Sequence, residues 1–190
     1  NIPMPETITS PLLYPAFDDT DGLFADSVEK RLGYPMVVKE AYGSFGAQVY
    51  LAKNRSELDA LRNRLKYMPH LYQRYVKNSS GEDIRIIVVG GKAVAAMKRK
   101  NNGDFRANIE LGGVGEKYIP SSEQVELSER ICRLLGADYI GVDLLFDKDK
   151  TLLCEVNTNA HFMFISDCTG VDVAKLYVGH VMEEIYGRAD

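Results

Sequence analysis

The sequence lacks the features that mark membrane-spanning, exported and repetitive proteins. No apolar run in the 190 residues approaches the ~20 residues of a transmembrane helix, and no charged-then-apolar leader precedes the chain. We find no internal repeat and no low-complexity tract either. We therefore expect a cytoplasmic protein without a membrane partner. Because the chain begins at Asn1 rather than Met, we also expect a portion of a larger protein.

Cysteine and concentrated positive charge are also scarce. Cys132, Cys154 and Cys168 are odd in number and lack the spacing of metal ligands, which predicts reduced, buried thiols. The net charge is −4, and the basic residues are dispersed along the chain. This distribution gives no bulk attraction to nucleic acid, so we expect no nucleic-acid partner. Nothing in the composition excludes a homo-oligomer.

A hydrophobic content of 45% is enough for one sizeable core or for two small subdomains that share an interface. The opening residues 1–15 carry four of the seven prolines and predict an extended connection. Apolar periodicity and turn residues then predict helices at 26–32, 54–66, 122–135 and 171–185. They predict strands at 35–39, 48–51, 70–76, 84–89, 92–97, 138–146 and 151–157. The expected apolar faces are Val125, Ile131, Leu134 and Leu135 on the third helix, and Val173, Leu176, Tyr177 and Val181 on the last.

The last predicted hairpin carries three oxygen-bearing side chains. If residues 148–150 form its loop, Asp143 lies opposite Glu155, and Asn157 joins the same face two residues further on. Magnesium prefers oxygen ligands and usually binds through one or two carboxylates together with substrate phosphates. The hairpin therefore suggests a magnesium site that serves a nucleotide.

The alternative is that these acids are solvated charges or turn residues. The same register sets Asp147 opposite Thr151, and it leaves apolar residues on both faces of the hairpin. That pattern predicts central strands covered on both sides, where a carboxylate needs a cation or an arginine as partner. The apolar residues are Leu144, Leu145, Leu152, Leu153 and Val156.

Two other segments have the chemistry to bind phosphate. Lys39 ends a predicted strand before the glycine-bearing segment 42–46, whose backbone amides can approach a ligand closely. The spacing matches neither the phosphate loop nor the dinucleotide fingerprint, and the glycines can equally serve the turn alone. In segment 104–108, Arg106 can hold phosphate bidentately and Asn108 can bond the same ligand, although a solvated loop charge is the alternative.

Taken in order, these segments resemble the ATP-grasp superfamily, and within it the RimK-type amino-acid ligases, whose characterised members add glutamate to a carboxylate. Residues 35–39 with the loop of Gly43, Ser44 and Gly46 resemble the hairpin that covers phosphate, in which the strand lysine contacts ATP. Gln73-Arg74-Tyr75-Val76 resembles the adenine linker, and Asp83-Ile84-Arg85 resembles the motif on the ribose and phosphate side. Arg106-Ala107-Asn108 resembles the Arg-x-Asn element. Gly141-Val142-Asp143 and Glu155-Val156-Asn157 resemble the two segments that hold two magnesium ions in the family.

The resemblance implies an α+β ATP-grasp fold over residues 1–186, in which two subdomains with antiparallel sheets grip the nucleotide between them. A smaller lid-like subdomain is expected at about 18–76 and a larger metal-binding subdomain at 77–186. The implied cofactors are ATP and two Mg²⁺ ions, with Mn²⁺ as an alternative ion. The additional N-terminal domain of such ligases is expected to be missing from this chain.

The implied reaction is attack of a carboxylate on the γ-phosphate of ATP, followed by conversion of the acyl phosphate to an amide by an amine. Lys39, Arg85 and Arg106 would hold phosphate oxygens, and Arg99 would do the same or bind the acceptor carboxylate. The implied partners are thus a small-molecule or peptide carboxylate and an amino-acid amine, and the branch that the chain resembles implies glutamate or another amino acid.

Two positions depart from the family pattern. Arg74 stands where the family commonly has Glu, so backbone contacts would carry adenine binding there. Residues 158–162 replace a Pro-Gly turn, and we expect this loop to face the substrate. Within it, four roles stay open for His161: an acid, a base, a substrate contact or a packed structural residue.

Two other functions stay open. A non-catalytic ATP- or ADP-binding regulatory module is allowed by Arg74 and the altered loop. A metal-stabilised domain without nucleotide would leave Lys39, Arg85 and Arg106 unexplained.

Overall fold

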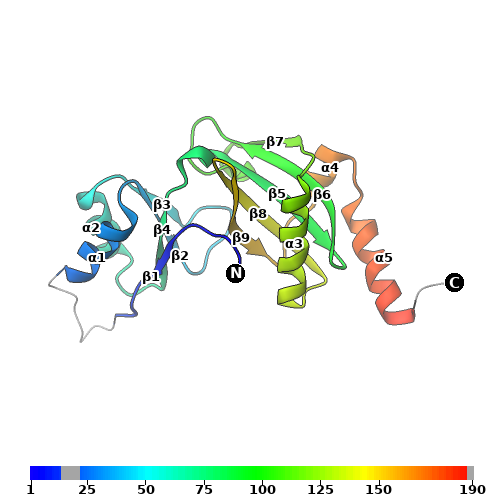
Figure 1. Ribbon diagram of the computed structural model, residues 1–190, viewed down its shortest axis with the longest axis horizontal. Helices are drawn as coiled ribbons and strands as arrows, with labels where there is room; N and C mark the ends of the chain where they lie inside the picture. The colour runs from blue at the N-terminus through cyan, green and yellow to red at the C-terminus, as the bar shows by residue number, and fades with distance from the viewer. Residues whose placement is uncertain (14–21, 188–190) are drawn as a thin grey trace. The chain divides into compact units, whose positions relative to one another are not determined.

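The computed structural model describes residues 1–13 and 22–187 (Figure 1). The chain divides into two compact units, one of Met4–Lys77 and one of Asn1–Pro3 with the chain from Asn78 onward. Residues 14 and 15 of the predicted opening connection and 18–21 of the predicted lid lie outside the described residues.

The smaller unit is a four-stranded antiparallel sheet in the order β1-β4-β2-β3. Its strands are β1 (Thr7–Thr9), β2 (Met36–Glu40), β3 (Val49–Ala52) and β4 (His70–Arg74). Helices α1 (Leu23–Leu32) and α2 (Arg55–Arg64) contribute buried side chains to the core on one face of this sheet. The predicted opening connection thus contains a short edge strand, β1.

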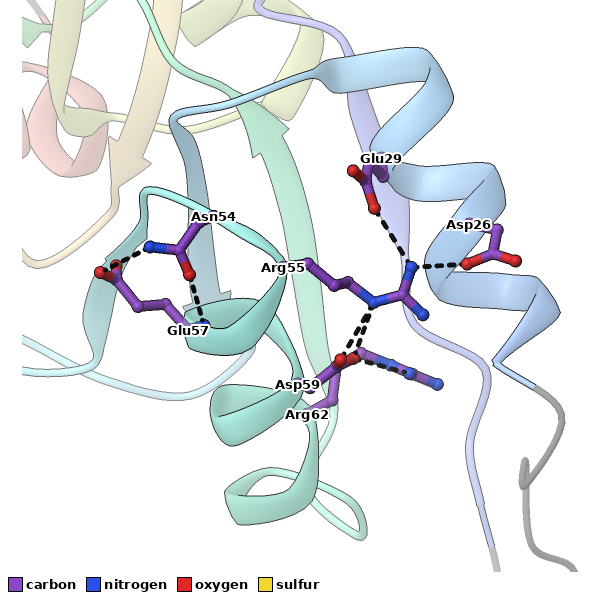
Figure 2. A network of polar contacts seen from close by, with 7 residues as sticks. All are labelled: Asp26, Glu29, Asn54, Arg55, Glu57, Asp59 and Arg62. Carbon is purple, nitrogen blue, oxygen red and sulfur yellow. Dashed lines mark hydrogen bonds and ion pairs between the residues drawn. The ribbon is translucent and has the colours of Figure 1, made fainter.

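An arginine links the two helices of this unit. The Arg55 side chain reaches Asp26 and Glu29 of α1 and Asp59 of its own helix, as Figure 2 shows. The hydrogen bonds that Arg55 donates to these carboxylates, that to Asp26 above all, raise its pKa. The Asn54 side chain accepts a hydrogen bond from the Glu57 backbone N–H and caps α2 at the start of the helix predicted for 54–66.

The larger unit is a five-stranded antiparallel sheet in the order β7-β6-β5-β8-β9. Its strands are β5 (Glu82–Val89), β6 (Lys92–Lys100), β7 (Val114–Lys117), β8 (Tyr139–Asp147) and β9 (Lys150–Asn157). The predicted Gly90-Gly91 turn joins β5 to β6, and both glycines have the positive φ that such a turn needs. Single 3-10 turns precede two of these strands: η1 (Lys77–Ser79) comes before β5, and η2 (Ile109–Leu111) comes before β7.

Alternation along the strands gives this sheet two different faces. One face packs Ile86, Val142 and Leu144 against α3 (Ser122–Leu135). The other packs its apolar end against α4 (Met163–Thr169) and the start of α5 (Val173–Tyr186). Figure 1 shows α3 and α5 as separate helices beside this sheet.

The boundaries of α3 agree with the prediction, and Ser121 and Gln124 form a capping box at its start. Its predicted apolar face is wrong in part, because Leu134 and Leu135 are 65% and 55% exposed. The buried stripe instead follows Leu127, Ile131 and Cys132.

The predicted apolar face of the last helix is also only partly correct. Val173 is buried, whereas Leu176 and Tyr177 are 42% and 37% exposed, because only the first turn of α5 joins the core cluster. The short helix α4 was not predicted from the sequence, since its apolar residues directly follow the acidic hairpin and show no clear period.

The acidic hairpin differs from its predicted register in two ways that cancel. Its turn is shorter than predicted, so Asp147 pairs with Lys150 and not with Thr151. A β-bulge next to Asp143 then leaves Cys154 without a partner in the ladder, which restores the predicted pairing of Asp143 with Glu155.

The prediction of two central strands is wrong for β9, which is an edge strand of the sheet. Part of this edge is covered by the start of the chain, because the Pro3 carbonyl accepts a hydrogen bond from the Leu153 N–H and Ile2 packs against the core. Covering an exposed edge in this way protects it from pairing with other chains.

Two expectations from composition can be compared with the described chain. No helix in residues 1–13 and 22–187 is long and apolar enough to cross a bilayer. All three cysteines are free, as predicted, but only Cys132 is buried.

The cap of α2 gives a first testable prediction. We expect Asn54→Ala to lower the free energy of unfolding by about 1 kcal/mol, because the Glu57 N–H loses its acceptor. Asn54→Ser, which keeps a capping oxygen, is the control and should lose much less. Urea unfolding of the three proteins measures both effects, and equal losses for Ala and Ser would contradict the capping role.

Candidate functional site

Six of the polar residues singled out in the sequence lie on one face of the larger sheet. The register pairs Asp83 with Arg99, Arg85 with Asp143, and Asp143 with Glu155. Directly paired residues point to the same side of a sheet, and Asn157 follows Glu155 at the interval of two that keeps it on that side. Four strands, β5, β6, β8 and β9, therefore bring these side chains together.

The core of this arrangement is a network of four charged side chains, of which Asp83, Arg99 and Asp143 are buried and Arg85 is half-buried. Arg85 donates from Nε and Nη2 to the two oxygens of Asp143, at 2.7 Å each. Arg99 donates from Nε and Nη2 to the two oxygens of Asp83, at 2.7 and 2.6 Å. The Arg99 Nη2 also reaches Asp143 Oδ2 at 2.8 Å, so the two pairs are joined.

Burial makes these pairings obligatory, since an unpaired charge away from water is costly. The side chain of Arg99 is only 2% exposed and that of Asp143 is 6% exposed. Burial alone would raise the pKa of Asp143, but Arg99 and Arg85 outweigh it and hold that pKa well below its ordinary value. Burial raises the pKa of Asp83, although Arg99, which is bonded to it, and Arg85 both act to lower that pKa.

The acidic hairpin has the donor chemistry of a site for Mg²⁺. Asp143 and Glu155 are cross-strand neighbours, and Asn157 adds an amide oxygen on the same face. Glu155 is exposed and Asn157 is half-buried, so two of the three donors can be reached from solvent. Within the described residues, no group of three or more His, Cys, Asp and Glu side chains has metal-binding geometry, and the third donor here is an amide.

The loop after β9 is held against the sheet beside these donors. The Tyr139 hydroxyl donates to the Ala160 carbonyl at 2.6 Å. Gly141 is a glycine for a spatial reason, since a Cβ there would lie 2.5 Å from the Ala160 methyl. Asn157 Oδ1 accepts from the Asn159 N–H and closes the start of the loop. His161 is exposed, so the interpretation of a packed structural histidine is wrong.

Arg106 lies in the loop that follows β6, and its charge is paired locally. Its Nε and Nη2 donate to Asp104 Oδ1 and Oδ2 at 2.9 and 2.6 Å. Hydrogen bonds from Arg106 are the main cause of the lowered pKa of Asp104. The loop is tied to the start of β5, because Gly81 donates to the Phe105 carbonyl and accepts from the Asn101 N–H. The loop that carries Arg106 and Asn108 therefore begins at the end of β6 where Arg99 lies.

In the smaller unit, the predicted binding residues divide between two faces of the sheet. Lys39 pairs with Leu71 and Gln73 pairs with Val37, which places Lys39 and Gln73 on the face opposite α1 and α2. Gln73 also donates to the Thr7 hydroxyl at 3.0 Å. Beyond β4, Tyr75 is half-buried and Val76 is buried.

Arg74 has its side chain on the other face. It donates to the Arg31 carbonyl at 2.7 Å and to Glu6 at 2.6 Å, at the end of α1. Cations at a helix C-terminus satisfy its free carbonyls and interact well with the helix dipole. The arginine that departs from the family pattern at position 74 is thus bound by Glu6 and by the end of α1.

The loop of Gly43, Ser44 and Gly46 is shaped by a residue that the sequence analysis did not single out. Gln48 Oε1 accepts from the Ser44 N–H at 3.1 Å. A Cβ at Gly43 would lie 2.5 Å from the same oxygen, so Gly43 is required by this close approach. Gly46 has a φ of 73°, which only glycine adopts easily.

Asp104, Gln48 and Ala160 were missed as parts of the site. Asp104 had a readable signal, since it lies only two residues before Arg106 in the same loop, within reach of a local ion pair. No comparable signal marks Gln48 or Ala160, whose contacts arise from the fold of their loops.

Comparison with known proteins adds a family and a fold. A model described as the RimK-like ATP-grasp domain matches residues 12–181. The chain is 34% identical to beta-citrylglutamate synthase B of Danio rerio, over 98% of this chain and 45% of that protein. It is 33% identical to N-acetylaspartylglutamate synthase A of Homo sapiens, over 98% and 47%. It is 32% identical to a probable alpha-L-glutamate ligase of Mannheimia succiniciproducens, over 86% and 56%. The chain spans about half the length of the curated relatives it matches.

Solved structures share the architecture at low sequence identity. D-alanine–D-alanine ligase from Bacillus anthracis superposes with a TM-score of 0.71 at 18% identity, over 96% of this chain and 63% of that chain. The ATP-grasp ligase PsnB does so with a TM-score of 0.71 at 17% identity, over 96% and 54%. These likenesses confirm the predicted α+β ATP-grasp fold.

The charge network gives a second testable prediction, on stability. The pKa of Asp143 lies below its ordinary value of 3.8, so its stabilising contribution is fully present above about pH 4 and is lost as the pH falls further. We expect Asp143→Asn to lower the free energy of unfolding by about 3 kcal/mol at neutral pH, because it leaves buried arginines with too few acceptors.

Urea unfolding at pH 7, 5, 4 and 3 would measure this difference, which should shrink below about pH 4. Asp149→Asn removes an exposed carboxylate from the turn of the same hairpin and is the control. The assignment is wrong if the two variants lose stability equally at pH 7.

Proposed function

Because this chain belongs to the RimK-like ATP-grasp family, we propose that it is the nucleotide- and metal-binding part of an ATP-dependent carboxylate–amine ligase. The reaction would proceed through an acyl phosphate, which an amino-acid amine converts to an amide. The observation that carries the proposal is the pairing of Asp143 with Glu155 beside Arg85 on one face of the sheet. Oxygen donors for a cation next to a guanidinium are the combination that phosphoryl transfer needs.

Asp143, Glu155 and Asn157 would hold the metal. Held there, magnesium would supply positive charge that neutralises the charge developing as the γ-phosphoryl group is transferred. One structural relative, the ligase PsnB, is described in a complex with Mg and ADP, which supports this cofactor pair. We propose two Mg²⁺ ions by analogy with the family, with Mn²⁺ as an alternative ion.

The basic residues would hold the reacting groups in line. Lys39, the strand lysine before the Gly43–Gly46 loop, would contact phosphate oxygens. Arg106 would exchange its contact with Asp104 for a phosphate oxygen, since its side chain is 21% exposed and its fork geometry suits both partners. Catalysis would rest on position and charge, without a covalent protein nucleophile.

Glutamate is the first candidate for the amine substrate. The two synthases and the probable ligase compared above all have glutamate in their names. The carboxylate partner differs between those names, so it has to be found by screening. The exposed His161, in the loop after β9, is a candidate contact for that acceptor.

A substitution at the hairpin tests the proposed function directly. We expect Glu155→Gln to lower ATP-dependent phosphate release by about a hundredfold or more while the fold is kept, because one metal-bridging charge is lost. The assay measures phosphate release from the full-length enzyme with a panel of carboxylates and amino acids, glutamate first.

Asp149→Asn, in the exposed turn of the same hairpin, is the matched control and should leave turnover unchanged. Wild-type turnover by Glu155→Gln would refute the metal assignment. Nucleotide binding without phosphate release under any substrate would favour the non-catalytic regulatory module instead.

A further inference from the structure

The two arginines that contact Asp143 differ in what else they bind. We propose that Arg99 is a positioning residue that stays with its acids, and that Arg85 is an exchangeable partner that moves from Asp143 to a phosphate when Mg²⁺ and nucleotide bind together. The inference rests on the proposed function. It replaces the direct phosphate contact that the resemblance implies for Arg99 with a positioning role.

Arg99 is fixed by both of its neighbours. Two of its nitrogens are bonded to the two oxygens of Asp83, and one of them also reaches Asp143. Its side chain is 2% exposed, and Asp83 has a side-chain exposure of only 10%. Leaving this position would strand the buried carboxylate of Asp83 and remove one of the donors to Asp143, which is strongly unfavourable. Arg99 therefore orients Asp83 and Asp143 and does not travel to a ligand.

Arg85 has a single acid partner and a more open position. It donates twice to Asp143, and its side chain is 14% exposed, against 2% for Arg99. Within residues 1–13 and 22–187, the Arg85 Nη1 makes no hydrogen bond that the structure records. Arg85 can thus exchange one oxyanion for another with less disruption than Arg99.

The crowding of acceptor positions on Asp143 favours such an exchange. A carboxylate offers about four acceptor positions, two on each oxygen. Oδ2 already accepts from both arginines, and Oδ1 accepts from Arg85. Only one position, on Oδ1, remains for a cation, and the positive charge of Arg85 lies beside it. A divalent cation bound at that position would lie next to the Arg85 guanidinium, and the repulsion between the two charges favours the release of Arg85 from Asp143.

This competition couples the two ligands. With Mg²⁺ alone, release of Arg85 would leave a largely buried guanidinium without an acceptor, so the cation should bind weakly. With nucleotide present, a phosphate oxygen accepts from Arg85 and completes the exchange. Each ligand then strengthens the binding of the other by the same factor, as thermodynamic linkage demands.

Arg85→Gln tests the exchange without an activity assay. Calorimetric titration of MgCl₂ into the chain in the absence of nucleotide should show Mg²⁺ binding about tenfold tighter than wild type, because the competing charge is gone. The same variant should bind ADP in the presence of Mg²⁺ more weakly than wild type. Arg85→Lys keeps the charge but not the two-pronged contact, and it should fall between the two proteins.

Lys98→Gln is the matched control, because it removes one positive charge from the same sheet. Lys98 pairs with Ile84 and bonds Glu82 at 2.8 Å, on the opposite face from the network. Its Mg²⁺ affinity should match wild type, which separates the local competition from a change in net charge.

Asp83→Asn provides a second, opposite test. Arg99 would then direct its full charge to Asp143, so Mg²⁺ should bind more weakly than to wild type. If wild type binds ADP in a Mg²⁺-dependent way but Arg85→Gln and Asp83→Asn leave the affinity for Mg²⁺ alone unchanged, the exchange is refuted and the proposed function stands. If wild type binds no nucleotide even with Mg²⁺, the proposed function fails and the exchange fails with it.

Discussion

The sharing of Asp143 between Arg85 and Arg99 is the interaction on which the rest of the site depends. It joins β5, β6 and β8 through five charged hydrogen bonds in a region that is nearly closed to water. Such bonds are strong when every group is satisfied and costly when one is removed. The network therefore fixes the position of Asp143, and through the register it fixes Glu155 opposite. The proposed cation site thus lies where the protein already holds both signs of charge.

The residues of this face could be identified from the sequence, because each one lies in a segment with a clear period or turn. The pairing of Asp143 with Glu155 followed from counting back from the turn, although the turn is shorter than predicted and a bulge makes up the difference. The capping residues of α2 and α3, Asn54 and Ser121, were equally readable, since capping is decided by neighbours in the chain. Local chemistry with a fixed spacing is what a sequence shows well.

Contacts between distant segments were not readable in the same way. Nothing near Arg74 in the sequence shows that its side chain binds Glu6 and the end of α1, which lie 68 and about 43 positions away. Arg85 and Arg99 contact Asp143 because β5 lies between β6 and β8 in the sheet. Short motifs do not encode this strand order, so the sequence did not show that these arginines pair with an acid. The exposure of Leu134 and Leu135 likewise depends on which side of α3 meets the sheet. These are properties of packing, and they appear only once the strands are placed.

The central claim is that the face carrying Asp143, Glu155 and Arg85 belongs to a metal-dependent nucleotide site. Calorimetric titration of ADP into this chain, once with Mg²⁺ and once with a chelator, tests it most directly. The account predicts measurable ADP binding with Mg²⁺ and a loss of most of the affinity when the cation is removed. Binding of ADP with equal affinity in both conditions, or no binding in either, would contradict it.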